Sequence, residues 1–238
     1  MRTTTTRQPR RGPSRAWKQR LRRRLLLSWP RLYATNRIKF ERSLTQDGEI
    51  EALLSKLDTT LSVPGNVIEC GSFLCGTTAC MALHLREQNC DKRIYACDTF
   101  EGFDPSEFAH ERQTGDACPD HDFTDNDFAY VQRKLKRLGV AQQITLIKGL
   151  FQETLESVPG PFAFSFIDCD LCDSLLYAAQ VVWPRLSPGG CCVFDDYEND
   201  RFRGATKAIE TFLGEQEATI GEQGPLSHKM YFACKQRV

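Results

Sequence analysis

Four short apolar runs of the sequence each end at or beside an acidic residue, and these acids are the side chains best placed to do chemistry. They are Glu69, Asp98, Asp168 and Asp195. Carboxylates gathered at neighbouring strand ends can bind a cationic ligand, accept hydrogen bonds from hydroxyls, or hold a hard divalent cation through oxygen. A structural acid is an ordinary explanation at any one position, but four positions marked in this way indicate a ligand site.

The first acid begins a glycine-containing turn, Glu69-Cys-Gly71-Ser-Phe-Leu-Cys-Gly76. Glycines allow a backbone to approach a ligand closely where a strand turns into a helix. The spacing departs from GxGxxG, and a carboxylate before the first glycine would not favour the pyrophosphate of a dinucleotide. It would favour the cationic amino group of S-adenosylmethionine. Asp98, at the end of the second run, is placed to accept hydrogen bonds from ribose hydroxyls.

The runs that end in these acids are predicted to be strands, because each is short, continuous and apolar. The predicted strands are residues 67–70, 94–97, 144–147, 162–167 and 191–194. Segments with helical spacing alternate with them, and these include residues 49–61, 128–138, 151–158 and 202–214. The alternation predicts a doubly wound α/β fold with a mostly parallel seven-stranded sheet and a terminal antiparallel strand pair within 218–234.

Two local features frame the fifth strand. Asp173 or Ser174 is expected to cap a helix that runs to about Leu186. Ser187-Pro-Gly-Gly190 is then expected to turn the chain into the strand. In sheets of this kind ligands bind outside the carboxyl ends of the strands, near the point where the strand order reverses, so the acids lie where a site is expected.

The order of these features resembles that of class I methyltransferases, which have an acid-x-Gly turn, acids after strands two and four, and a Leu-x-Pro-Gly-Gly turn before strand five. More narrowly, the chain resembles the macrocin and mycinamicin O-methyltransferases of the TylF/MycF family. The stretches that carry this resemblance are Val67–Gly71, Asp98–Gly102, Lys148–Thr154, Ile167–Leu171 and Phe194–Tyr197. They fall within roughly residues 64–212, and the N-terminal segment lies outside them.

The resemblance implies transfer of a methyl group from S-adenosylmethionine to a hydroxyl of a sugar or sugar-bearing natural product, with Mg²⁺ held by Asp168, Asp195 and Asp196. Electrostatics agrees, because converging carboxylates repel one another unless a hard cation lies between them. Mg²⁺ bound to two neighbouring acceptor oxygens would lower the pKa of the hydroxyl, and Asp168 is expected to take its proton as general base. Asp170 and Asp173 are interpreted as structural.

The expected cofactor-binding residues are Glu69, Gly71, Ser72, Gly76, Thr77, Asp98, Thr99, Gly149 and Asp168. The acid-rich segment 99–127 is longer than an ordinary connection and has apolar anchors such as Phe103 and Phe123. We expect it to be a lid or substrate loop. Within it His121 is a candidate catalytic residue, for substrate binding or proton transfer, and the alternative is a histidine that takes no part in catalysis.

The sequence has 238 residues, enough for one domain with an extended core. Its 31 basic and 31 acidic residues are unevenly placed, because 14 of the basic residues and a single acid lie within residues 1–42. We therefore expect a basic N-terminal arm at 1–42, partly disordered or helical, and a methyltransferase domain at 43–238. The arm has neither a run of about 20 apolar residues to span a membrane nor the core of a signal peptide.

Several roles stay open for the basic arm. They are peripheral contact with an anionic membrane, phosphate binding, packing on the domain or on a second subunit of a homodimer, and an organelle transit peptide. No nucleic acid partner is expected, because nothing that reads bases accompanies the arm. Eleven cysteines are an odd number, which argues against a disulfide framework and for a cytoplasmic location.

The cysteine pattern adds little chemistry. Cys169 and Cys172 have CxxC spacing, but no second pair completes a zinc site. The remaining cysteines, such as Cys191 and Cys192, are interpreted as small core residues.

Three alternatives to the sugar O-methyltransferase stay open. A catechol or another vicinal diol could be the methyl acceptor, because metal-dependent catechol methylation uses a similar set of acids. A nicotinamide-dependent oxidoreductase would use a similar sheet, but the missing GxGxxG and the adjacent Asp195 and Asp196 count against it. A non-catalytic methyltransferase-like binding module, tethered by the arm, would be expected to have lost some of the site acids.

Overall fold

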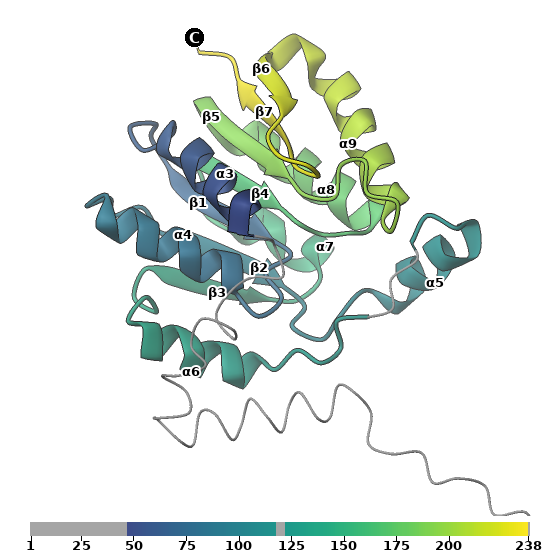
Figure 1. Ribbon diagram of the computed structural model, residues 1–238, viewed down its shortest axis with the longest axis horizontal. Helices are drawn as coiled ribbons and strands as arrows, with labels where there is room; N and C mark the ends of the chain where they lie inside the picture. Colours follow the sequence, from purple (N-terminus) through teal and green to yellow (C-terminus); the bar gives the residue numbers. More distant parts are fainter. Residues whose placement is uncertain (1–46, 118–121, 238) are drawn as a thin grey trace, which may run out of the picture.

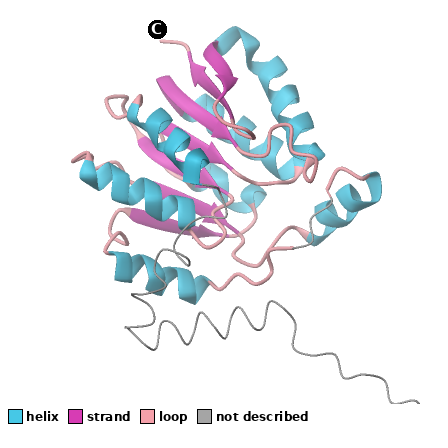
Figure 2. Cartoon of the chain, in the orientation of Figure 1, coloured by secondary structure: helices cyan, strands magenta, loops and turns pink. Residues whose placement is uncertain are grey.

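The architecture is a seven-stranded sheet with helices on both faces (Figures 1 and 2). The strands are β1 (Asn66–Cys70), β2 (Ile94–Asp98), β3 (Ile144–Lys148), β4 (Phe162–Ile167), β5 (Leu186–Phe194), β6 (Ile220–Pro225) and β7 (Tyr231–Lys235). The computed structural model describes residues 47–117 and 122–237, so the arm at 1–42 and the candidate His121 lie outside the described residues.

The strand order is β3-β2-β1-β4-β5-β7-β6. All pairings among β1 to β5 are parallel, whereas β7 runs antiparallel to both β5 and β6. The order reverses between β1 and β4, which is the switch point of a doubly wound sheet. The predicted α/β fold with a terminal antiparallel pair is therefore confirmed.

Helices form one layer on each face of the sheet. The helices are α3 (Asp47–Asp58), α4 (Gly76–Glu87), α5 (Pro105–Thr114), α6 (Phe128–Leu138), α7 (Phe151–Thr154), α8 (Cys172–Val182) and α9 (Arg203–Gln216). The apolar side chains of α3, α4 and α6 form one buried cluster with the sheet, and those of α8 and α9 form a second. Consecutive residues of β1, Val67 and Ile68, point into opposite clusters, as the pleat of a strand requires. All six residues of β4 are buried because both faces are covered.

Helix α5 belongs to neither layer and stands beside the start of α9 (Figure 1). It lies within 99–127, which was expected to be a loop. The side chain of Asp104 caps it by accepting hydrogen bonds from the backbone N–H groups of Ser106 and Glu107, and Pro105 occupies the first turn. The segment is therefore partly helical.

Two further local expectations were wrong. The residues expected to turn the chain into the fifth strand lie inside β5, which begins at Leu186, with a register shift against β4. Helix α8 begins at Cys172, and neither Asp173 nor Ser174 caps it, because Leu171 occupies the cap position. The acceptors for its first N–H groups come from α5, as described below.

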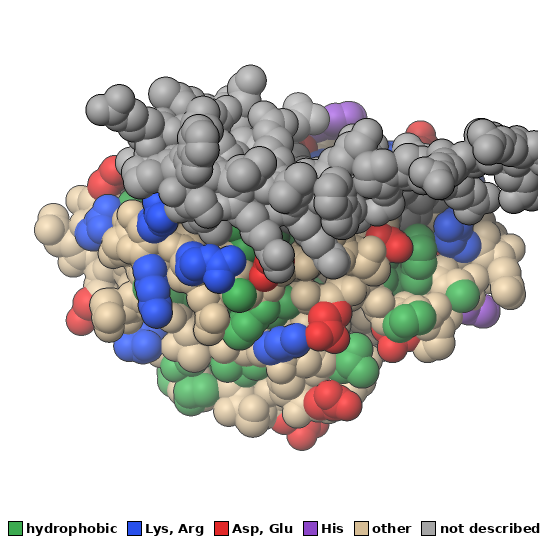
Figure 3. Space-filling model, turned by 90° about the horizontal axis from the view of Figure 1, so that it is seen from below, with side chains coloured by type: hydrophobic (Ala, Val, Ile, Leu, Met, Phe, Trp, Pro, Cys, Tyr) green, Lys and Arg blue, Asp and Glu red, His purple; other side chains and the backbone are tan. Residues whose placement is uncertain are grey.

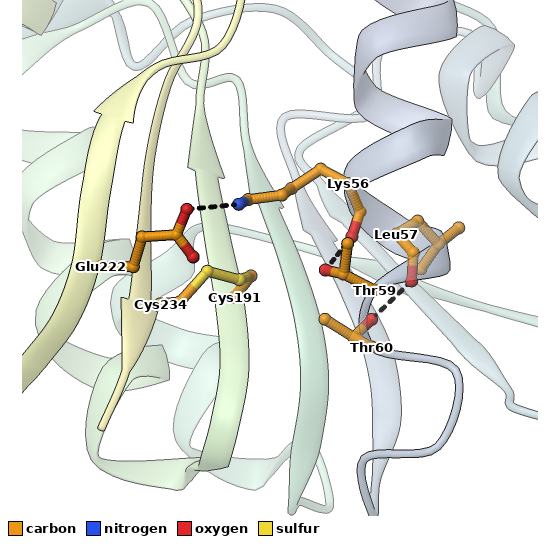
Figure 4. The surroundings of a disulfide bond; sticks show 7 residues. All are labelled: Lys56, Leu57, Thr59, Thr60, Cys191, Glu222 and Cys234. Carbon is orange, nitrogen blue, oxygen red and sulfur yellow. Dashed lines mark hydrogen bonds and ion pairs between the residues drawn. A yellow bond between two sulfur atoms is a disulfide. The ribbon is translucent and has the colours of Figure 1, made fainter. Parts of the chain in front are cut away.

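A disulfide joins Cys191 of β5 to Cys234 of β7 (Figure 4). The two residues face each other directly in the antiparallel register. The interpretation of Cys191 as a simple core residue was therefore incomplete, although its side chain is buried. The other described cysteines are free. Within the described ranges, none of the helices has the length and apolar character that crossing a membrane needs.

Candidate functional site

Hydrogen bonds between neighbouring strand ends bring the predicted acids to one edge of the sheet. The N–H of Gly71 donates to the carbonyl of Cys97 at 2.9 Å, and the N–H of Asp168 donates to the carbonyl of Cys70 at 2.8 Å. The N–H of Asp195 donates to the carbonyl of Ile167 at 2.9 Å. These bonds extend the parallel pairing past the strands, so the chain segments that carry the acids leave the sheet side by side.

Gly71 is the point at which two of these segments touch. Its φ is +88°, and a Cβ added there would lie 1.7 Å from the carbonyl oxygen of Asp168. Only glycine fits this approach, because any side chain would overlap the backbone of Asp168. Gly71 was predicted to let a ligand approach the backbone, and in the structure it lets the backbone of Asp168 approach.

Side chains from other elements fix the turn that follows Gly71. The Asp98 carboxylate accepts hydrogen bonds from the N–H groups of Phe73 at 2.7 Å and Phe100 at 2.5 Å. The buried ammonium of Lys134, on α6, donates to the carbonyl of Leu74 at 2.8 Å. The turn is therefore held in place without a ligand.

Glu69 lies beneath this turn and is 1% exposed. It accepts a hydrogen bond from the hydroxyl of Thr78 on α4, and its burial raises its pKa to about 8. A buried carboxyl of this kind ionises readily only when a cation is bound beside it. Ser72 is buried in this turn, and Thr77 is buried in the first turn of α4.

Of the other predicted cofactor residues, Thr99 and Gly149 lie next to Asp98 and Gly76 begins α4. The hydroxyl of Thr99 donates to the carbonyl of Gly102 at 2.6 Å. The N–H of Gly149 donates to the backbone carbonyl of Asp98 at 3.1 Å, which ties the end of β3 to the end of β2. The structure therefore places these residues along the ends of three adjacent strands.

Asp168, Asp195 and Asp196 form what we call the acid cluster. Each offers a carboxylate oxygen, and these oxygens lie within 4.8 Å of one another. Asp195 and Asp196 are each 2% exposed, whereas Asp168 keeps part of its surface open to solvent. Burial, followed by the charge of Asp196, raises the pKa of Asp195 to about 6. Burial and the other two carboxylates hold the pKa of Asp168 well above its usual range.

The acid cluster fits a hard divalent cation. Its ligand atoms are all carboxylate oxygens, which Mg²⁺ prefers, and three neighbouring anions need a cation between them. Oδ1 of Asp195 is buried and accepts no hydrogen bond from any described residue. Such an atom is a ready ligand, because a buried oxygen without a partner is otherwise costly.

Three residues of this region were missed or given only a structural role. Lys229 pairs with Oδ2 of Asp195 at 2.8 Å and with Oδ1 of Asp196 at 3.2 Å. The side-chain amide of Asn199 donates to Oδ1 of Asp196 at 2.5 Å. Asp170, interpreted as structural, lies against Asp196, and its burial together with that contact holds its pKa well above the usual range.

The charge of Lys229 is set by its neighbours. Burial opposes the ammonium, but the carboxylates of Asp195 and Asp196 outweigh it and hold the pKa of Lys229 above its ordinary value. No local sequence pattern predicts that Lys229 contacts the acid cluster, because it follows Asp196 by 33 positions and lies in the connection between β6 and β7.

Two glutamates of α5 cap α8 from outside its own sequence. Oε1 of Glu111 accepts from the N–H of Cys172 at 2.5 Å, and Oε1 of Glu107 accepts from the N–H of Ser174 at 2.9 Å. Carboxylates are favourable at a helix N-terminus, where backbone N–H groups lack partners. Burial raises the pKa of Glu111 to about 7. These contacts dock the 99–127 segment onto the body of the protein.

Aromatic packing and an ion pair complete this docking. The ring of Phe103 contacts those of Phe108 and Phe123 at centroid distances of 5.1 and 4.9 Å. Phe123 also contacts Phe73 of the turn beside Asp98, at 5.2 Å. Asp116 pairs with Lys207 of α9 at 2.6 Å. The segment is thus joined to the turn after Gly71 at one side and to α9 at the other.

A pocket of about 340 Å³ lies elsewhere, along the edge strand β3. Its lining residues belong to α6, β3 and the connection between them, and they include none of the predicted site residues. The face seen from below in Figure 3 carries Lys and Arg side chains gathered toward one end, with hydrophobic side chains scattered between them. The lining of this pocket therefore offers none of the carboxylates that lie at the strand ends.

A sequence model of a family described as Macrocin-O-methyltransferase (TylF) matches residues 9–222. This match reaches further than the motif stretches within 64–212 and takes in most of the basic arm, which the motifs had left outside the resemblance. It also includes every predicted site residue.

Two relatives with assigned activities match part of the chain. The first is the 8-demethyl-8-(2,3-dimethoxy-alpha-L-rhamnosyl)-tetracenomycin-C 4'-O-methyltransferase of Streptomyces olivaceus, 31% identical over 156 residues, which are 60% of this chain and 57% of the relative. The second is the mycinamicin III 3''-O-methyltransferase of Micromonospora griseorubida, 27% identical over 143 residues, 57% of this chain and 56% of the relative. The matched stretches thus span little more than half of either relative.

Solved structures share the fold. The O-methyltransferase NovP superposes with a TM-score of 0.68 at 19% identity, covering 79% of this chain and 80% of its own. The calicheamicin methyltransferase CalS11 superposes with a TM-score of 0.69 at 20% identity, covering 98% of this chain and 99% of its own. At these identities the likeness is one of architecture, and it agrees with the strand order described above.

Proposed function

Because the chain belongs to the macrocin O-methyltransferase (TylF) family, we propose that it transfers a methyl group from S-adenosylmethionine to a hydroxyl of a sugar or sugar-bearing natural product. The observation that carries the proposal is the meeting of two carboxylate sites at one sheet edge, Glu69 beneath the glycine turn and the acid cluster beside it. The printed activities of the two relatives, both O-methyl transfers, support the reaction type.

The cofactor would lie across the ends of β1 and β2. Glu69 would bind its ammonium group, since burial disfavours the anion and the nearby charge of Lys134 offsets this only in part, so that the pKa of Glu69 stays at about 8. Asp98 would accept hydrogen bonds from the ribose hydroxyls, because its two oxygens offer about four acceptor positions at the end of β2 and the N–H groups of Phe73 and Phe100 take one on each oxygen. Gly71 and Gly149, which carry no side chain, would allow the ligand to approach the backbone.

Asp168, Asp195 and Asp196 would hold a divalent cation, which supplies charge that lowers the pKa of a bound hydroxyl and fixes its position. Asp168 is the one residue of the acid cluster that is only half-buried as a whole, which favours it as the member next to the acceptor. We assign it the role of general base.

The chemical step needs no covalent bond to the enzyme. S-adenosylmethionine would supply the methyl group, with its sulfonium leaving as a neutral thioether when the acceptor oxygen bonds to the methyl carbon, and Asp168 would take the proton of the hydroxyl. The main task of the protein is to align the oxygen, carbon and sulfur atoms and to exclude water. The docked 99–127 segment, with its glutamate and phenylalanine contacts, would cover the acceptor during this step.

Calorimetric titration of S-adenosylhomocysteine, followed by methyl-transfer assays with sugars and catechols in Mg²⁺ and in chelator, tests the proposal. We expect micromolar cofactor binding and Mg²⁺-dependent methylation of a glycoside hydroxyl. Asp168→Asn should abolish turnover and leave cofactor binding largely intact. Methylation of catechols but not of sugars would contradict the acceptor class, and absence of cofactor binding would contradict the reaction.

A further inference from the structure

Lys229 reaches the acid cluster from the connection between β6 and β7. Its side chain is 26% exposed, whereas the two carboxylates that it contacts are 3% exposed. Its backbone is anchored, because its carbonyl accepts from the N–H of Tyr197 at 2.9 Å and the N–H of Leu226 donates to the carbonyl of Met230 at 2.8 Å. Lys229 is therefore built into the site and does not belong to a freely moving surface loop.

The strand register explains why the lysine meets the acids. In the antiparallel pair, Val193 faces Phe232 and Phe194 faces Tyr231. The same register continued by two positions brings Lys229 opposite Asp196, which agrees with the hydrogen bond at Tyr197. A slip of one residue would turn the side chain to the other face of the sheet.

The ammonium lies against two of the three carboxylates that would hold a metal. It contacts one oxygen of Asp195 and one of Asp196, and it leaves Oδ1 of Asp195 without a partner among the described residues. A lysine is a compact single charge on a flexible four-carbon stem, so its head group can move while its backbone stays fixed. A divalent ion would carry twice the charge and would be held by all three carboxylates.

We propose that Lys229 is a tethered counter-ion that occupies the acid cluster before the divalent cation arrives, and that metal binding requires its ammonium to withdraw. The inference rests on the proposed metal site. Lys229 would neutralise buried carboxylates in the metal-free protein, and it would also weaken metal affinity, because the ammonium and the cation carry charge of the same sign and are held by the same carboxylates. The lysine thereby sets the metal concentration at which the site fills.

The test is calorimetric titration of Mn²⁺ into the full chain after treatment with chelator, without cofactor or acceptor. Lys229→Met should bind Mn²⁺ roughly tenfold more tightly than the wild type, or better, since a partly buried charge of the same sign as the metal has been removed. Lys229→Arg keeps the positive charge and should show no gain. Lys56→Met is the matched control, because Lys56 pairs with Glu222 outside the acid cluster and its loss should leave the affinity unchanged.

The melting temperature of the variants is a second measurement of the same effect. Removal of the ammonium leaves the carboxylates without their counter-ion, so Lys229→Met should melt at a lower temperature in chelator and gain more from Mn²⁺ than the wild type does. Lys229→Gln keeps a hydrogen-bond donor without the charge, and we expect the same gain in affinity if the methionine variant does not fold.

Each outcome bears on a different claim. Equal or weaker Mn²⁺ binding by the uncharged variants overturns the counter-ion role and leaves the metal site standing. Absence of Mn²⁺ binding in the wild type and in every variant overturns the metal site and this inference with it. Tighter binding by the control Lys56→Met as well would show that the gain comes from net charge alone, and would also overturn the role of Lys229.

Discussion

Cofactor affinity should depend steeply on pH, because the carboxyl group proposed to bind the ammonium is protonated at neutral pH in the empty site. Burial raises the pKa of Glu69 from its ordinary value of 4.5 to about 8. The cationic ligand binds the ionised form. Below pH 8, binding must therefore release a proton, and the apparent affinity falls as the pH falls.

The size of the effect follows from the ionised fraction. With a pKa of about 8, half of the Glu69 carboxyls are ionised at pH 8 and about 1% at pH 6, so the affinity should drop about 50-fold between these values. Above pH 8 the fraction can only double, and the profile should flatten. An unshifted glutamate would give no change in this range.

S-Adenosylhomocysteine is a suitable ligand, because it carries the same ammonium group. Its affinity would be measured by calorimetry at pH 6, 7 and 8, in two buffers with different ionisation enthalpies to count the released protons. Glu69→Gln should weaken binding and flatten the profile. Burial also raises the pKa of Asp98, so the glutamine variant is needed to assign the slope to Glu69. Glu87→Gln, at the exposed far end of α4, should keep the wild-type slope.

Two results would refute this reasoning. An affinity that stays constant from pH 6 to 8 would mean that the Glu69 carboxyl is already ionised without the ligand. A slope that survives in Glu69→Gln would mean that another group titrates, and the ammonium site would have to lie elsewhere.

Two substitutions test the packing around the site. Gly71→Ala should sharply lower the urea midpoint of unfolding or prevent folding, because its Cβ would lie 1.7 Å from the Asp168 carbonyl oxygen. The control is Gly214→Ala in helix α9, which should be neutral or stabilising because the new Cβ meets no neighbouring atom within 4 Å. Similar urea midpoints for both variants would contradict the close approach at Gly71. Glu111→Ala removes a cap of α8 at a cost of about 1–2 kcal/mol and should speed proteolysis within 99–127, with Gln113→Ala on the exposed side of α5 as control. Equal cleavage rates would argue that the segment is not docked through Glu111.

The sheet and its acids were predictable because each depends on a short stretch of sequence. Parallel strands that are covered on both faces have continuous apolar sequences, and all six residues of β4 are buried. The acids at strand ends were placed correctly along one edge, since the carboxyl ends of parallel strands must meet there. The extent to which Glu69 is buried, which raises its pKa to about 8, could not be predicted from the sequence.

The residues that were missed depend on pairings between distant segments. Lys229 meets the acid cluster only through the register of β5 against β7, which the sequence of either strand leaves undetermined. Helix α8 was assigned a local cap, but its acceptors are Glu107 and Glu111, more than 60 residues earlier in the chain. The disulfide between Cys191 and Cys234 depends on the same strand pairing.

The capping of α8 by glutamates of α5 has a consequence for engineering acceptor preference. Grafting the 99–127 segment of a relative onto this chain would test its proposed role in covering the acceptor, but it would also exchange the groups that satisfy the N–H groups of Cys172 and Ser174. A donor segment without carboxylates at the positions of Glu107 and Glu111 would leave a helix end unsatisfied close to the acid cluster. Chimeras should therefore keep these two glutamates as part of the scaffold and vary the residues around them.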